Sequence, residues 1–185
     1  MIQSLAKIKN VSFDIHRFLE EIVETELPKM AMQNAYFGAG ILAGGIEFFG
    51  ACLDAHPIPE EKKSAERFCL ALNTLFPAAY HPLSRPAPYT KNEKGTHDLY
   101  TSLRCGMAHV LRPQGVFLTG GIAEATVDGN SHLQILTRDG KSGPLIIVEQ
   151  FAADFVAAAK QLQAQLCSAP LPQKLAGDFL KVWPS

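Results

Sequence analysis

Two residues whose side chains can act together on a phosphate lie five positions apart in the middle of this 185-residue chain, Arg104 and His109. A guanidinium is permanently charged and forms paired hydrogen bonds with phosphate oxygens, whereas an imidazole gains and loses a proton near neutral pH. One group can hold a phosphate while the other moves a proton beside it. The two residues are therefore the candidate catalytic pair, and the chemistry that they suit is phosphate chemistry.

The pair belongs to a segment from Thr96 to Leu111 whose apolar residues recur at helical spacing. Successive side chains on an α-helix turn by about 100°, so Arg104 and His109 point about 140° apart. A single straight helix does not bring them to one cleft. Two copies of the helix around a two-fold axis can do so, and symmetric dimers are the commonest oligomers. We therefore expect a homodimer.

The run from Asp98 to His109, with four residues between the arginine and the histidine, resembles the signature of the HEPN superfamily (higher eukaryotes and prokaryotes nucleotide-binding). The resemblance covers the helical part of the chain, from Ser12 to Pro113. It implies RNA cleavage without a metal or another cofactor, at a site shared by two protomers. There His109 would assist the attacking 2′-hydroxyl or the leaving oxygen, and Arg104 would bind the scissile phosphate of single-stranded RNA. A bound nucleotide is the other ligand expected at this site.

A noncatalytic function remains the alternative. Active members of the superfamily most often carry a polar residue, commonly asparagine, at the position of Cys105, and many members bind RNA or protein without cleaving anything. Gly106 also weakens the helix inside the motif. In a protein-interaction or structural domain, Arg104 would form an ion pair inside the bundle, for which Glu47 is the expected partner. His109 would then interact with the free carbonyls at the end of its helix.

Four residues are candidate auxiliary groups of this site: His97, Thr101, Cys105 and Glu47. His97 and Thr101 lie on the same side of the helix as Arg104. The chain has no His-Glu-x-x-His, paired Cys-x-x-Cys or phosphate-binding glycine loop, so we expect no metal ligands and no cofactor.

The composition narrows the function further. The net charge is −1 and the lysines and arginines are scattered, which excludes the basic stripe that dominates nonspecific binding to duplex nucleic acid. The four cysteines are far apart and fit reduced thiols. Because the first ten residues lack the apolar run of a secretory signal, we expect a cytoplasmic protein.

Apolar spacing and capping residues predict a bundle of helices. The first starts at Ser12 or Asp14 and is interrupted by Pro28. The second, Ala35–Leu53, is long enough to span a membrane, but Glu47 lies inside it at a cost of roughly 2.5–3.5 kcal/mol. A central helix of a soluble bundle, without membrane contact, is the favoured interpretation. A third helix runs from about Pro59 to Pro77, and a proline-rich irregular stretch at 76–95 precedes the motif helix, for which Thr96 or Asp98 is the expected cap.

Beyond Gly115 the pattern of apolar residues becomes typical of β-strands in three short runs, 116–119, 133–136 and 145–148. The expected turns between them are Asp128-Gly129-Asn130 and Asp139-Gly140-Lys141. Helices are expected again at 151–166 and 175–182. The sequence thus predicts one α+β domain over 1–185: a mainly α-helical, HEPN-like bundle (12–113), a small antiparallel β-sheet inserted near residues 116–149, and C-terminal helices (150–183).

Overall fold

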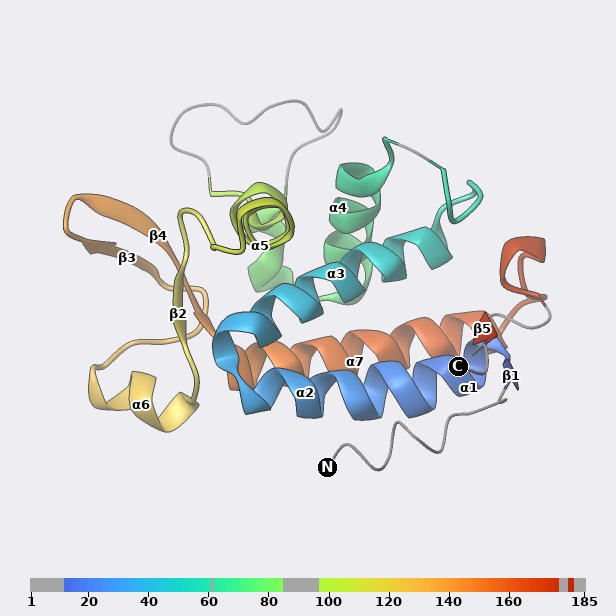
Figure 1. The fold of residues 1–185 in the computed structure, drawn as a ribbon, viewed down its shortest axis with the longest axis horizontal. Helices are drawn as coiled ribbons and strands as arrows, with labels where there is room; N and C mark the ends of the chain where they lie inside the picture. The colour runs from blue at the N-terminus through green and yellow to red at the C-terminus, as the bar shows by residue number, and fades with distance from the viewer. Residues whose placement is uncertain (1–11, 61, 85–96, 177–179, 182–185) are drawn as a thin grey trace.

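The computed structural model describes residues 12–60, 62–84, 97–176 and 180–181, and shows helices with a three-stranded sheet at one end (Figure 1). This mainly helical α+β class is the one that the sequence predicts. The described elements are β1 (Ser12–Phe13), α1 (Ile15–Phe18), η2 (Leu19–Glu26), α2 (Leu27–Gln33), α3 (Ala35–Leu53), α4 (Ser64–Leu75), η3 (Ala78–Leu83), η4 (Tyr100–Cys105), α5 (Gly106–Val110), β2 (Phe117–Thr119), α6 (Ile122–Val127), β3 (Ile135–Arg138), β4 (Lys141–Ile147), α7 (Val148–Cys167), η5 (Gln173–Leu175) and β5 (Leu180–Lys181).

The first helix begins where predicted, because the side chain of Asp14 accepts a 2.8 Å hydrogen bond from the backbone N–H of Arg17. Its expected interruption at Pro28 is wrong: α1, η2 and α2 follow one another without a break as far as Gln33. The η2 segment is a π-helix, and Pro28 lies in the first turn of the α-helix that succeeds it. A proline is tolerated there because its missing N–H is not needed.

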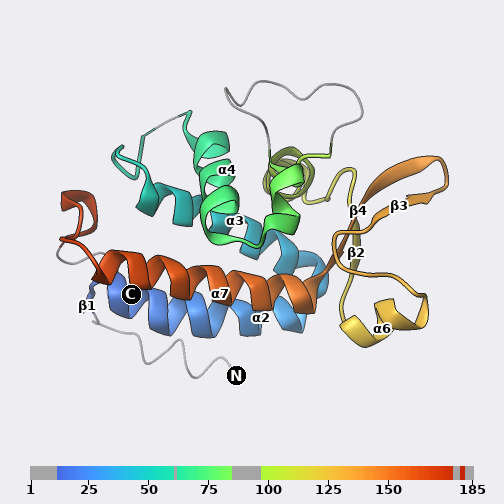
Figure 2. The same ribbon diagram turned by 180° about the vertical axis from the view of Figure 1, so that it is seen from behind.

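Helix α3 lies at the centre of the bundle. Figure 2 shows α7 and α2 side by side, with α3 crossing them and α4 packed on α3. Phe49 of α3 stacks on Phe155 of α7 at 4.7 Å between ring centroids. A Cβ atom at Gly45 would lie 2.5 Å from the same Phe155 ring, so the close approach requires glycine. By length and composition α3 could also cross a membrane, yet half of its most apolar window is buried inside the protein.

The sheet has the order β2-β4-β3 and is mixed, not antiparallel as expected. Strands β3 and β4 form the predicted hairpin, with positive φ at Asp139 and Gly140, but β2 runs parallel to β4. The reason is a helix, α6, between β2 and β3, which the sequence interpretation did not include. Gly129 therefore ends α6 in the left-handed conformation rather than turning between two strands.

Three other segments differ from what the sequence predicts. Helix α4 begins at Ser64, not near Pro59. The expected helix at 175–182 is wrong: its described residues contain the end of η5 and strand β5, which pairs antiparallel with β1. Strand pairing depends on partners 167 and 169 positions away, Phe13 with Leu180 and Ser12 with Lys181, which local periodicity does not reveal. In the proline-rich stretch at 76–95, Ala78–Leu83 is a 3-10 helix, and positions 85–96 lie outside the described residues.

Candidate functional site

The motif helix is capped by Asp98, one of the two caps that the sequence predicts. Its carboxylate accepts hydrogen bonds from the backbone N–H of Thr101 (3.1 Å) and from the Thr101 hydroxyl (2.7 Å). The helix then runs as a π-helix, η4, and continues as α5 from Gly106. It ends at Leu111, which adopts a left-handed conformation with φ of 50°. A π-helical turn is rare and changes which side chains share a face.

Arg104 is paired with Glu47 of α3, the partner expected for a structural role. The Nε of Arg104 donates a 2.6 Å hydrogen bond to Oε2 of Glu47, and the two side chains are 24% and 21% exposed. Burial alone would lower the pKa of Arg104, but the adjacent Glu47 carboxylate outweighs this effect and raises the pKa. The guanidinium also lies 5.8 Å from the centre of the Tyr100 ring. The pair joins the motif helix to the central helix of the bundle.

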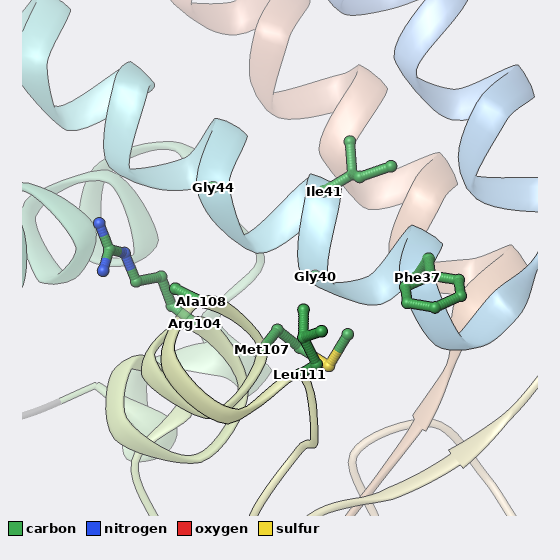
Figure 3. A pocket seen from close by; sticks show the side chains of 8 residues that line it. All are labelled: Phe37, Gly40, Ile41, Gly44, Arg104, Met107, Ala108 and Leu111. Atoms are coloured by element: carbon green, nitrogen blue, oxygen red, sulfur yellow. The ribbon is translucent and has the colours of Figure 1, made fainter.

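A groove with a volume of about 500 Å³ lies between α3 and the motif helix (Figure 3). We call it the α3–α5 groove and define it by eight lining residues: Phe37, Gly40, Ile41, Gly44, Arg104, Met107, Ala108 and Leu111. All of them except Arg104 are apolar. The groove is therefore suited to receive apolar side chains, with one cationic side chain on its wall.

The two ends of this groove have opposite shapes. Phe37 and Leu111 are large side chains that remain 51% and 65% exposed. A Cβ atom built at Gly44, by contrast, has no neighbour within 4 Å. Phe37 and Gly44 are seven residues apart, which is about two helical turns, so both face the same side of α3. The surface thus has a protruding side chain at Phe37 and open space above the helix backbone at Gly44, which we call the Gly44 hollow.

The remaining predicted site residues have different surroundings. His109 is exposed and does not line the α3–α5 groove. Thr101 is engaged with Asp98 in the cap, and His97 lies just before that cap. Cys105 is half-buried beside Tyr100, whose pKa is raised by burial and by a hydrogen bond with Cys105. Of the predicted set, the structure brings together Arg104 and Glu47, and places Cys105 close enough to Arg104 to contribute to its raised pKa.

Two polar clusters were missed by the sequence analysis. In one, Asp54 at the end of α3 accepts hydrogen bonds from Arg67 (2.7 Å) and Lys174 (2.8 Å). In the other, the hydroxyl of Tyr80 lies between His132 and Asp154. Their members come from distant parts of the chain, and no local spacing signals either cluster. Within the described ranges, there is no group of three or more His, Cys, Asp or Glu side chains that could hold a metal ion.

Comparison of the chain with protein-family models, with curated proteins and with solved structures gave no match.

Proposed function

We propose that this chain is a noncatalytic protein-interaction domain that self-associates through the α3–α5 groove. The observation that carries this proposal is the shape of the groove: an apolar surface with a large protruding side chain, Phe37, and an open hollow, Gly44, on one face of one helix. Exposed apolar surfaces of this kind are typical of sites that bind another protein.

The occupant that fits this shape is a second copy of the chain. A two-fold axis close to Ile41 would run α3 antiparallel to α3 of the partner. Each Phe37 would then enter the hollow at the other copy's Gly44, because the two positions are separated by about 10 Å on the same face. Small residues let helices approach closely, and a glycine facing a large apolar residue packs well. The same surface patch serves both copies, as two-fold symmetry requires.

The charges around the groove favour binding over catalysis. The Arg104 guanidinium is engaged by Glu47 at 2.6 Å, so the pair contributes little net charge to the groove wall. His109, the expected acid–base group, does not face the groove. A phosphodiester entering this apolar space would leave water and meet one cationic side chain among the lining residues, Arg104, whose Nε is already paired with Glu47.

The test is a comparison of oligomeric state between wild type and two groove variants. Gly44→Phe fills the hollow, and Phe37→Glu places a charge on the protruding end. We expect each variant to raise the dissociation constant of the dimer at least tenfold, which corresponds to about 1.4 kcal/mol. Sedimentation equilibrium measures this constant. Ala157→Phe, at an exposed position on α7, is the matched control and should dimerise like wild type. The proposal is contradicted if the wild-type chain stays monomeric at about 100 µM, a concentration above the dissociation constants usual for stable dimers.

RNA cleavage at an HEPN-like composite site is the second candidate function, and one observation favours it. Among the described residues, the two terminal nitrogens of Arg104 have no hydrogen-bond acceptor, because only Nε is used by Glu47. These donors could hold a phosphate oxygen while the ion pair stays intact. The candidate requires the dimer to bring His109 of a partner copy close to Arg104, which a single chain does not do.

A further inference from the structure

A hydrogen-bonded chain of three side chains lies outside the α3–α5 groove, where the sheet meets the bundle. The hydroxyl of Tyr80 in η3 lies 2.7 Å from Nε2 of His132 and donates a 2.7 Å hydrogen bond to Oδ2 of Asp154 in α7. Gln150 donates to the other carboxylate oxygen, Oδ1, at 2.9 Å. Tyr80 is only 1% exposed, and the His132 side chain 11%. Because these three side chains are buried, the hydrogen bonds between them are not readily replaced by water.

The geometry assigns the neutral form of His132. Its Nδ1 accepts a 3.0 Å hydrogen bond from the backbone N–H of Ile147, so Nδ1 cannot carry a proton. The single proton of the neutral ring is therefore on Nε2, which donates to the Tyr80 hydroxyl. Tyr80 in turn donates to Asp154. Every donor in this hydrogen-bonded group of side chains has an acceptor only while His132 remains neutral.

His132 also joins parts of the fold that are distant in sequence. It precedes β3, while Ile147, whose backbone N–H donates to its Nδ1, is the last residue of β4. Its ring lies 5.6 Å from the ring of Tyr80 and 6.5 Å from that of Phe151 in α7. The imidazole therefore connects the β3–β4 hairpin, η3 and α7 at one point.

We propose that protonation of His132 acts as an acid-sensitive latch, which releases the three-stranded sheet from the bundle while α3 and α7 stay folded. A proton added at Nδ1 would point directly at the N–H of Ile147, so the hydrogen bond at the end of β4 would become a contact between two donors. The positive charge of the imidazolium would also be buried away from water, which is unfavourable. Both effects favour an opened sheet in which the ring reaches water.

The charged groups around the ring set the direction of the pH dependence. Within the described residues, Asp154 is the one charged group acting on His132, at 3.9 Å from Nε2, and Tyr80 and Gln150 are neutral neighbours. Burial lowers the pKa of His132 from 6.5 to about 4, and the attraction of Asp154 offsets only part of this shift. Since the folded pKa is below the unfolded value, the closed sheet is fully stable above about pH 6.5 and is destabilised as the pH falls towards 4.

The latch also reaches the segment that follows the motif helix. A Cβ atom at Gly143 of β4 would overlap the backbone oxygen of Gly115, so the hairpin packs directly on the chain between α5 and β2. Opening the sheet removes this support from the end of the α3–α5 groove that Leu111 forms. The latch itself stands on the Tyr80, His132 and Asp154 contacts and does not depend on the proposed dimer.

Hydrogen exchange measured by mass spectrometry on the full chain tests the latch. After correction for the intrinsic rates, opening of peptides covering 117–147 should increase about 50- to 100-fold between pH 7 and pH 4.5, with a much smaller change in α3. His132→Asn keeps an acceptor near Ile147 but cannot titrate in this range, so its sheet should open to a similar extent at both pH values. His81→Gln, at an exposed histidine in η3, is the matched control and should behave like wild type.

A second measurement needs no variant. The titration of His132 can be followed by NMR of histidine-labelled wild-type protein, and a midpoint well below 6 is expected. A midpoint of about 6.5, the value of a solvated histidine, would overturn the proposal. So would sheet protection that is equal at pH 7 and pH 4.5, or an equal pH dependence in His132→Asn and wild type.

Discussion

Arg104 Nε donates a 2.6 Å hydrogen bond to Oε2 of Glu47, and so ties the motif helix to α3 across 57 positions of sequence. Both side chains are about a quarter exposed, which places the pair between a fully buried and a solvated ion pair. Such a pair fixes the orientation of both side chains. The arginine that the sequence marks for phosphate chemistry therefore has a structural contact in the folded protein.

Breaking this pair should destabilise the fold by a moderate amount. We expect Glu47→Gln and Arg104→Met each to lower the free energy of unfolding by about 1–3 kcal/mol, more than a surface pair and less than a fully buried one. Urea denaturation of both single variants and the double variant gives the coupling energy. A coupling below about 0.5 kcal/mol would show that the two side chains act independently.

Two glycines of the same helix should respond to alanine in opposite ways. A Cβ atom at Gly44 meets open space in the single chain, so Gly44→Ala should stabilise the folded monomer by about 0.5–1 kcal/mol through higher helix propensity. A Cβ atom at Gly50 would overlap the backbone oxygen of Arg67, so Gly50→Ala must separate α3 from α4. We expect a loss of about 3 kcal/mol or more for this variant in thermal or urea unfolding. Equal effects at both positions would contradict the described packing.

The cluster at the end of α3 should make stability sensitive to strong acid. Burial alone would raise the pKa of Asp54, but hydrogen bonds from Lys174 and Arg67 outweigh it and lower the pKa. Since the folded pKa is below the unfolded value, the contribution of Asp54 is complete above about pH 4 and is lost as the pH falls below that. Asp54→Asn should cost about 3–5 kcal/mol at pH 7, because two cations lose their carboxylate.

A matched substitution separates this effect from a general loss of negative charge. Asp139→Asn changes an exposed turn residue with positive φ, a conformation that asparagine accepts. Its free energy of unfolding should remain within about 0.5 kcal/mol of wild type. If Asp54→Asn were equally mild, Lys174 and Arg67 would have to find other acceptors.

Assays for ribonuclease activity decide between the two proposed functions. For a noncatalytic domain we expect wild type to cleave single-stranded RNA in EDTA no faster than an Arg104→Ala, His109→Ala double variant. Cleavage that leaves 2′,3′-cyclic phosphate ends and falls at least tenfold in each single variant, with thermal stability retained, would instead establish the HEPN-like activity, since general acid–base assistance contributes about 10²–10⁴.

Local sequence patterns were sufficient for elements whose signals lie within a few residues. The span Ala35–Leu53, the caps at Asp14 and Asp98, and the Asp139-Gly140 turn were all predicted, because caps, turns and apolar periodicity are properties of neighbouring residues. The pairing of Glu47 with Arg104 was also predicted, since a lone carboxylate in an apolar helix needs a partner.

Tertiary contacts decided what depends on distant partners. The parallel pairing of β2 with β4, the pairing of β5 with β1, and the meeting of Tyr80, His132 and Asp154 each join residues that no local pattern relates. The same holds for the α3–α5 groove, because the exposure of Phe37 and Gly44 depends on where the motif helix comes to lie against α3. Composition and periodicity determine which helices form, whereas the packing between them determines which side chains remain available for function.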